Sequence, residues 1–336
     1  MTLRQTSNRK RILYMTPQRN CNGCEGSLRP WLFMPIDAKK NTKTNYPAVL
    51  QCAVCKLGVL DPLPKKGAIQ QFYELNSYYT HGEGHITPLR ETFADRILNR
   101  IAWGMDYGRS FEPRMIAPKL PIGGSVCDLG CGNAKYLQQF RDLGFETIGI
   151  DPDQTAREQA RSAGVTVLPG TSEDLPAEML NKKFDLVIMT HSLEHCLDPM
   201  RALVNAYKLT KPGGLCYIEV PNCQSRHFQT FSICSEMFDA PRHIYFFEPN
   251  TLSAMMTKLS FIPLESLFNG YCRNFNQSWR GWELTIADRI KKNSPALKPK
   301  KHSFACSVLL LFNSFWRQPQ KKYDSFGLLM KRPGRA

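Results

Sequence analysis

The chain has 336 residues, 44 Lys and Arg against 29 Asp and Glu, and a formal net charge of +15, so it is long enough to bury a large core. A hydrophobic content of 42% excludes a largely disordered chain, and no apolar run reaches the length of a bilayer-spanning helix. The first residues lack the apolar core of a secretory signal and match an organelle transit peptide poorly. We therefore expect a cytoplasmic protein whose 12 cysteines are reduced thiols or metal ligands.

Four of these cysteines form two close pairs near the amino terminus. Cys21 and Cys24 are separated by two residues, as are Cys52 and Cys55, and 27 residues lie between the pairs. Four thiolates would close a tetrahedral shell, so the spacing predicts a structural zinc ion without a catalytic water. The residues after the second cysteine of each pair are not glycines, which departs from the usual knuckle. A rubredoxin-like iron site and four unrelated thiols are the alternatives.

The next segment links this site to a larger domain. The aromatic pairs Phe72-Tyr73 and Tyr78-Tyr79 are expected to make core and docking contacts. From Pro88 to Met105, apolar residues recur at a spacing near 3.6 (Leu89, Phe93, Ile97, Ile101), which predicts a helix. We therefore divide the chain into a zinc ribbon and linker at 1–84, a leading helix at 85–117 and a larger domain at 118–336.

The segment Val126–Gly132 is the most informative part of the larger domain. An apolar strand end runs into Asp128 and then into Gly130 and Gly132, and a second acid, Asp151, ends the next strand. Glycines let the backbone approach a ligand closely, and an acid about 20 residues on can accept the hydroxyls of a ribose. The pattern predicts a site for a nucleoside cofactor, and a tight turn without a ligand is the alternative.

Two details distinguish between nucleoside cofactors. A dinucleotide fingerprint has a third small residue where this chain has Lys135, which is too bulky to allow close helix packing. Asp128 would repel a pyrophosphate, but it suits a cofactor that carries an amino group and a sulfonium. An NAD-dependent enzyme is therefore the least favoured hypothesis.

Strand, turn and helix signals alternate from Ser125 to Val220. Phe184–Met189 is predicted to be a buried parallel strand, and Lys211–Gly214 is predicted to be a helix stop and turn that leads into another strand, Leu215–Pro221. Phe261–Leu264 and Phe326–Met330 are expected to be the final two strands, the last one antiparallel. This alternation favours a doubly wound α/β sheet.

Several of these motifs resemble those of a known family. Asp128-x-Gly130-x-Gly132, Leu193–His195, Lys211–Gly214 and Val220–Asn222 together resemble the ubiquinone-biosynthesis-like branch of the class I S-adenosylmethionine (SAM) methyltransferases. The resemblance implies a Rossmann-like α/β fold with a seven-stranded, mostly parallel sheet. It also implies SAM as cofactor and a small-molecule, sugar or carrier-linked acceptor, with oxygen as the expected attacking atom.

The resemblance also implies the cofactor residues. Asp128 would face the methionine amino group, the backbone of Gly130, Cys131 and Gly132 would pass close to the cofactor, and Asp151 would hold the ribose hydroxyls. Ser172 and Glu173 follow the third strand and would flank the adenine. A helix N-cap box at 171–175 is the alternative explanation for these two residues.

The residues after the fourth strand are candidates for the reaction itself. If a helix begins here, His191, Glu194 and His195 share one face. Relatives that methylate catechol-like hydroxyls carry Glu-x-x-Glu-His here and bind magnesium, but His191 replaces the first Glu, which puts a magnesium site in doubt. A zinc-like ion, an acid–base pair or a structural His195 are the alternatives.

His243 is the first choice for a general base. It lies in the segment Asp239–Phe247 after the fifth strand, which covers the acceptor pocket in similar enzymes. A neutral imidazole can accept a proton near pH 7. A buried histidine with a purely structural role is the alternative.

The carboxyl-terminal part holds most of the positive charge, with 14 Lys and Arg against 3 Asp and Glu from residue 273 to 336. A basic helical insertion is expected at about 272–322, where Phe304, Val308, Leu311, Phe312 and Phe315 follow helical spacing. The helix is expected to be a lid on the acceptor pocket, or else an interfacial helix. Possible partners of the basic residues are an anionic membrane and nucleic acid, and solvated lysines without a partner are the alternative.

Two other functions remain open at this point. The zinc ribbon and the basic charge would suit an RNA-directed methyltransferase. A non-catalytic partner protein that binds SAM and zinc would carry the same cofactor motifs without turning over an acceptor.

Overall fold

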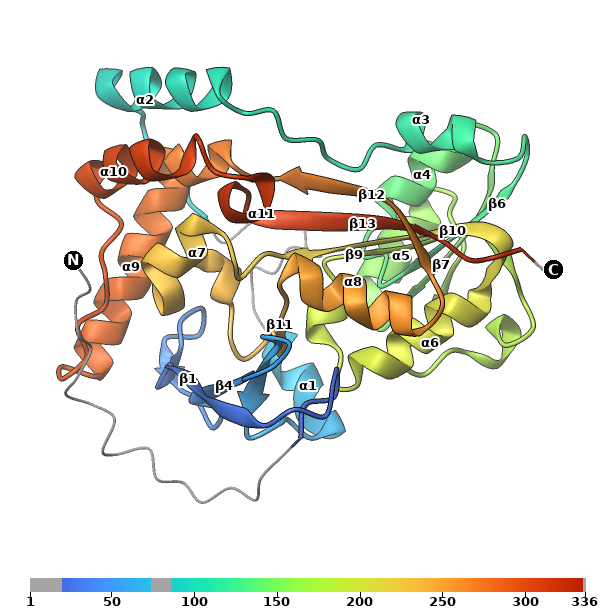
Figure 1. Cartoon of the computed structure of the whole chain (residues 1–336), viewed down its shortest axis with the longest axis horizontal. Helices are drawn as coiled ribbons and strands as arrows, with labels where there is room; N and C mark the ends of the chain where they lie inside the picture. The colour runs from blue at the N-terminus through green and yellow to red at the C-terminus, as the bar shows by residue number, and fades with distance from the viewer. Residues whose placement is uncertain (1–19, 74–85, 335–336) are drawn as a thin grey trace.

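The computed structural model of the chain describes residues 20–73 and 86–334 (Figure 1). The amino-terminal residues considered as a signal or transit peptide, and the aromatic pair Tyr78-Tyr79, lie outside the described residues.

Strands and helices are named in chain order. The strands are β1 (Leu28–Phe33), β2 (Ile36–Asp37), β3 (Thr42–Lys43), β4 (Ala48–Cys52), β5 (Gly58–Asp61), β6 (Ser125–Leu129), β7 (Glu146–Asp151), β8 (Val167–Pro169), β9 (Phe184–Thr190), β10 (Thr210–Pro221), β11 (Tyr245–Phe246), β12 (Ile262–Asn269) and β13 (Ser325–Lys331). The α-helices are α1 (Lys66–Tyr73), α2 (Phe93–Gly104), α3 (Pro113–Ile116), α4 (Lys135–Asp142), α5 (Gln154–Ser162), α6 (Pro199–Leu209), α7 (Arg226–Phe231), α8 (Pro249–Lys258), α9 (Gln277–Asn293), α10 (Phe304–Ser314) and α11 (Pro319–Lys322). Four short 3-10 helices matter below: η4 (Leu193–His195), η5 (Ser232–Cys234), η6 (Glu236–Phe238) and η7 (Cys272–Phe275).

The larger sheet has seven strands in the order β12-β13-β10-β9-β6-β7-β8. The pairs β10/β9, β9/β6, β6/β7 and β7/β8 are parallel, whereas β13 runs antiparallel to both β10 and β12. This topology confirms the predicted Rossmann-like, mostly parallel sheet, including the antiparallel last strand. It also brings the carboxyl ends of β6, β7 and β9 to one edge, where ligands bind in such sheets.

Helices cover both faces of this sheet (Figure 1). Alternate strand residues point to opposite faces, so Val126 and Tyr217 join one apolar cluster and Cys127 and Ile218 join the other. The first cluster lies under α3, α4 and α5, and the second under α6 and α8. Burial on both faces explains why the central strands are nearly continuous in apolar residues.

The predicted turn at Lys211–Gly214 falls inside β10. Helix α6 does end before it, at Leu209, as expected. The pairing of β10 with β9 then shifts register between Thr210 and Leu215, and Gly213 has a positive φ of 81°. The glycine pair therefore makes an irregular start to the strand instead of a separate turn.

A smaller sheet contains the amino-terminal strands in the order β1-β4-β5-β11. Its last strand comes from far along the chain, because Tyr245 and Phe246 pair antiparallel with Val59 and Gly58. β11, which follows β10 in the chain, therefore completes the sheet that contains the amino-terminal strands. Figure 1 shows β11 beside this sheet.

The predicted leading helix is present but differs from expectation. α2 begins at Phe93, after Thr92 caps it through a hydrogen bond from the Asp95 amide, so Leu89 lies before the helix. Its buried side is formed by Asp95, Leu98 and Ala102. The apolar residues whose spacing predicted the helix lie on its exposed side, which the pattern could not indicate.

The basic insertion contains η7 and three helices, α9, α10 and α11. α10 confirms the predicted helix, but it buries Ser307, Leu310, Leu311 and Ser314, and only Leu311 belongs to the predicted apolar set. It packs against α7 and α2. Across residues 20–73 and 86–334, no helix combines the length and apolar character needed to cross a membrane.

Candidate functional site

The turn after β6 has a backbone conformation that lets a ligand come close to the main chain. Gly130 and Gly132 have φ values of 83° and 52°, in the left-handed region that favours glycine. A Cβ added at Gly130 would lie 2.6 Å from the Cβ of Ser192, so no other residue fits there without a shift. The amides of Gly130 and Cys131 both donate to the Ile150 carbonyl, which ties this loop to β7.

The two predicted carboxylates lie on either side of this loop. Asp128 is 1% exposed and its Oδ1 has no hydrogen-bond partner. Burial, followed by the charge of Asp151, raises the pKa of Asp128 to about 8. Asp151 accepts hydrogen bonds from the amides of Gly132 and Asp153, both at 2.8 Å. A buried carboxylate that lacks a partner favours a positively charged ligand at this position, and the residues present therefore fit a SAM amino group.

Ser172 and Glu173 lie close to the same edge but already have protein partners. Ser172 is buried with its Oγ 3.3 Å from the Cys196 Sγ, and Glu173 accepts a hydrogen bond from the Asp198 amide at the start of α6. No helix begins at 171–175, although the Thr171 side chain accepts a hydrogen bond from the Asp174 amide. A role of Ser172 and Glu173 beside an adenine remains a prediction.

His191 does not share a helical face with Glu194 and His195. It has a φ of 50°, and the 3-10 helix η4 spans only Leu193–His195, so the helix on which the shared face depended does not begin at His191. The half-exposed His191 ring instead lies between two carboxylates, with Nδ1 3.4 Å from Glu194 and Nε2 3.3 Å from Glu219. Burial opposes the charged form, but the two carboxylates outweigh it and raise the pKa of His191.

Glu219 is a site residue that the sequence did not identify. It lies on β10 and accepts hydrogen bonds from the Tyr217 hydroxyl and from the Asn269 amide group. Burial raises its pKa, but the hydrogen bond from His191 and the His191 charge outweigh burial and lower it to about 2. A carboxylate inside an otherwise apolar strand was the available signal, since such a residue is rarely buried without a function or a partner.

Glu194, His195 and His243 form a second contact set. One ligand atom from each residue lies within 4.8 Å of the others, a spacing that could hold a metal ion. Glu194 is fully buried and neither of its carboxylate oxygens has a hydrogen-bond partner. The His243 Nε2 lies 3.9 Å from Glu194 Oε1, and the His195 and His243 rings are 4.9 Å apart.

The tautomers of the two histidines follow from their backbone partners. His195 Nδ1 is 2.9 Å from the Arg242 carbonyl, and His243 Nδ1 is 3.0 Å from the Met237 carbonyl. A carbonyl only accepts, so each Nδ1 carries a proton and each Nε2 of the neutral ring keeps a lone pair. Burial and then the neighbouring His195 lower the pKa of His243 to about 4, so this ring is neutral near pH 7. The set can thus accept a proton or bind a cation.

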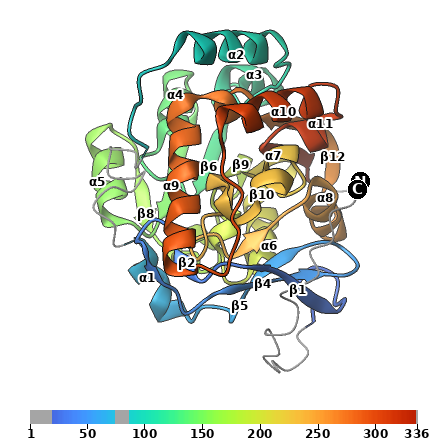
Figure 2. The same cartoon turned by 90° about the vertical axis from the view of Figure 1, so that its left-hand side faces the viewer.

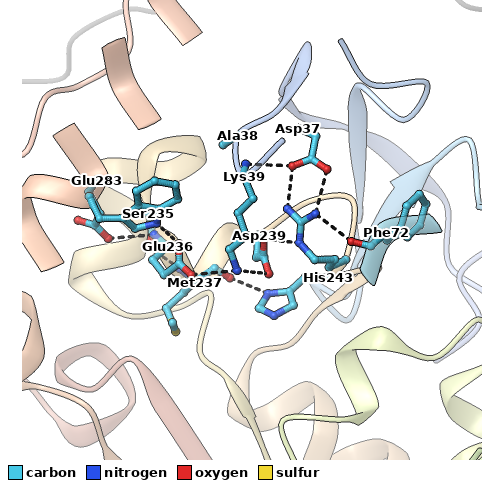
Figure 3. A network of polar contacts seen from close by, with 12 residues as sticks. Asp37, Ala38, Lys39, Phe72, Ser235, Glu236, Met237, Asp239, His243 and Glu283 are labelled. Carbon is cyan, nitrogen blue, oxygen red and sulfur yellow. Dashed lines mark hydrogen bonds and ion pairs between the residues drawn. The ribbon is translucent and has the colours of Figure 1, made fainter. Parts of the chain in front are cut away.

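Buried ion pairs join the loop that carries His243 to the amino-terminal segment (Figure 3). The Lys39 Nζ lies 2.8 Å from Asp239 and 3.1 Å from Glu236, and all three side chains are nearly buried. Arg242 binds both oxygens of Asp37 at 2.8 and 2.9 Å and also contacts Asp239 at 2.8 Å. This network fixes the residues that directly precede His243 in the chain, and no motif in the sequence indicated it.

The four predicted metal ligands come together in the amino-terminal segment. Sγ atoms of Cys21 and Cys55, and of Cys24 and Cys52, are 3.5 Å apart, and all four lie within 4.8 Å of one another. Glu25 and Lys56, which follow the second cysteines, have φ values of 63° and 65°. They adopt the left-handed conformation that glycine usually provides in a knuckle, which explains the departure from the usual pattern. Four thiols at this spacing fit a tetrahedral ion.

Comparisons with known proteins agree with this geometry. A methyltransferase-domain family model matches residues 107–265. The chain is 28% identical over 170 residues to a ubiquinone biosynthesis O-methyltransferase of Cereibacter sphaeroides, covering 48% of this chain and 65% of the relative. It is 33% identical over 113 residues to the enzyme of the same name from Caulobacter vibrioides, covering 32% of this chain and 44% of the relative.

A third relative is matched over more of its length. A ubiquinone biosynthesis O-methyltransferase from another strain of Cereibacter sphaeroides is 26% identical over 239 residues, which is 66% of this chain and 90% of the relative. The chain therefore spans less than two thirds of the first two relatives but most of the third.

Proposed function

Because a methyltransferase-domain family model matches residues 107–265, we propose that the chain is a class I SAM-dependent methyltransferase. It would transfer a methyl group from SAM to a small-molecule, sugar or carrier-linked acceptor, with oxygen as the attacking atom. The observation that carries this proposal is the fully buried Asp128, which lacks a hydrogen-bond partner beside a glycine loop at the carboxyl edge of the sheet.

The cofactor would be held by residues at the carboxyl ends of two neighbouring strands, β6 and β7. Asp128 would accept a hydrogen bond from an amino group, the backbone at Gly130–Gly132 would allow close approach, and Asp151 would accept from ribose hydroxyls. Bound SAM would supply a methyl group on a positively charged sulfur. The protein must then align the acceptor and exclude water.

His243 would accept the proton of an acceptor hydroxyl. Its Nε2 keeps a lone pair because Nδ1 donates to the Met237 carbonyl, and its lowered pKa keeps the ring neutral. Glu194 would stabilise the imidazolium formed, since its Oε1 lies 3.9 Å from the His243 Nε2 and neither of its oxygens has a hydrogen bond. His191 and His195 would orient the Glu194 carboxylate and offset its negative charge. Alternatively, Glu194, His195 and His243 would each contribute one ligand atom to a divalent ion.

We further propose that Cys21, Cys24, Cys52 and Cys55 bind one structural zinc ion. Metal analysis of the purified chain should find one zinc per chain, and Cys24→Ser should remove it, whereas Cys306→Ser outside the cluster should not. Iron in place of zinc would support the rubredoxin-like alternative instead.

Calorimetry would test the cofactor assignment. We expect SAM to bind and NAD not to bind, and Asp128→Asn to weaken SAM binding at least tenfold. Asp142→Asn, which removes an exposed carboxylate on the same βα unit, should leave it unchanged. Binding of NAD in place of SAM would overturn the proposal.

Labelled SAM added to cell extract would then identify the acceptor. Incorporation that disappears with Asp128→Asn supports methyl transfer by this chain. SAM binding without turnover on any acceptor class would instead support a non-catalytic partner protein. Incorporation only into RNA would support the RNA-directed alternative.

A further inference from the structure

Large apolar side chains are unevenly distributed over the surface. Among residues 20–73 and 86–334, 17 large hydrophobic residues are exposed, and ten of them lie between 89 and 107 or between 304 and 316. These stretches contain α2 and α10, which pack against each other and lie along the same side of the molecule in both views (Figures 1 and 2). Exposed apolar groups gathered in this way mark an interaction surface.

The exposed side of α2 combines apolar and basic residues. Phe93, Ile97 and Ile101 recur every four residues and are 73%, 46% and 42% exposed. Arg96 and Arg100 are exposed beside them on the same helix. A helix whose outward side alternates apolar and arginine side chains has the composition of helices that lie in the plane of a membrane surface.

The exposed side of α10 has the same character. Leu309 and Phe312 on α10, and Trp316 two residues after its end, are between 61% and 82% exposed. The surrounding segment, residues 294–323, contains six Lys and Arg and no Asp or Glu. Tryptophan prefers the boundary between headgroups and acyl chains, and lysine and arginine are attracted to anionic headgroups.

We propose that the exposed sides of α2 and α10 dock on the surface of an anionic lipid bilayer. We call this surface the α2–α10 face, and it comprises Phe93, Ile97, Ile101, Leu309, Phe312 and Trp316 with Arg96 and Arg100. The apolar side chains would lie below the headgroups and the basic ones beside the phosphates. The contact is peripheral, since the described residues contain no membrane-crossing helix.

An anionic lipid bilayer accounts for both the exposed apolar side chains and the basic side chains of the α2–α10 face. Nucleic acid would satisfy the basic residues but would leave six large apolar side chains in water. A second copy of the chain would cover the apolar side chains, but it would bring the acid-free segment 294–323 against its own equivalent.

Co-sedimentation of the full chain with vesicles would test this proposal without cofactor or acceptor, so its outcome is separate from that of the methyl-transfer proposal. We expect binding to vesicles of phosphatidylcholine and phosphatidylglycerol at 0.1 M NaCl, on the order of tenfold weaker binding at 0.5 M, and weak binding to phosphatidylcholine alone. The double variant Phe93→Gln, Ile97→Gln should reduce the partition coefficient at least tenfold.

Matched variants separate the face from general surface effects. Leu143→Gln with Leu180→Gln removes two exposed apolar side chains elsewhere and should leave binding unchanged. Arg96→Gln with Arg100→Gln should weaken binding at low salt only. Absence of wild-type binding to anionic vesicles, or equal binding of the Phe93, Ile97 variant, would overturn the proposal. A concentration-dependent dimer abolished by the same double variant, without vesicle binding, would overturn it in favour of a second copy.

Discussion

Within residues 20–73 and 86–334, two groups consist of two histidines and a glutamate, and their surroundings differ. Glu194, His195 and His243 lie at the carboxyl edge of the larger sheet, where both Glu194 oxygens lack hydrogen bonds. His227, Glu283 and His302 join α7, α9 and the segment before α10, and each is at most 2% exposed.

The second group has its hydrogen bonds largely satisfied. Glu283 accepts from His227 at 3.0 Å, from His302 at 2.6 Å and from the Glu236 amide at 2.9 Å. The remaining nitrogen of His302 lies 3.0 Å from the Ser307 hydroxyl. The comparison teaches that residue type alone does not distinguish a reactive group from a structural one. Satisfied hydrogen bonds fit a structural role for Glu283. Glu194 has ionic contacts with His191 and His243 but no hydrogen bond, which fits the proposed role at a ligand site.

The largest expected effect concerns stability. Glu283→Gln should lower the free energy of unfolding by about 3–5 kcal/mol, because it disrupts a fully buried network in which the Glu283 carboxylate accepts hydrogen bonds from both histidines. Glu194→Gln should change it by less than about 1 kcal/mol, because no hydrogen bond of the Glu194 oxygens is lost and His191, its ion-pair partner, keeps the Glu219 carboxylate. Urea unfolding measures both, and equal losses would remove the distinction between the two groups.

The pH dependence of stability should also show that Glu283 stabilises the fold. Burial alone would raise the pKa of Glu283, but the His227 charge and the hydrogen bonds from both histidines lower it from an ordinary 4.5 to about 2. A lowered folded-state pKa contributes stability above about pH 4.5 that is lost as the pH falls towards 2, on the order of 3 kcal/mol in total. Wild-type stability should fall across this window, and Glu283→Gln should show a flatter profile in urea unfolding at each pH.

Turnover should depend on the other group. Once an acceptor is identified, His243→Ala should lower kcat by about 100-fold or more, the range expected for loss of a general base. The acid limb of the kcat/KM profile should lie well below pH 6.5, because the pKa of His243 is lowered to about 4 by burial and by His195. Unchanged turnover of His243→Ala would remove this residue from the mechanism. His302→Gln serves as the control, since its first effect should be on unfolding.

The smallest expected effect concerns the hydrogen bond from the Tyr217 hydroxyl to Glu219. Tyr217→Phe removes the hydroxyl that donates to Glu219 and should cost about 1 kcal/mol of stability. His191, the other partner of Glu219, should then titrate at a higher pH by NMR, because the carboxylate loses a competing donor. A His191 titration that does not move would show that the two partners act independently.

The sequence predicted the fold well where the signal is local. The strands from Val126 to Val220, the glycine loop and the cysteine pairs were predictable, because the residues that define each of them are close together in the sequence. The outward orientation of Phe93 and Ile97 was not predictable, because helical spacing shows that a face exists but not which way it points. The contacts of Glu219 with His191 and of Arg242 with Asp37 join residues more than 25 positions apart, and no spacing rule reports them.

The pairing of β5 with β11 has a consequence for the order of assembly during synthesis. All four cysteines have left the ribosome long before Tyr245 and Phe246 are made, so a metal ion can be captured while one edge of the small sheet is still open. That edge closes only when the loop bearing His243 arrives. An amino-terminal fragment ending before residue 245 should therefore load metal normally yet remain prone to self-association through its unpaired strand.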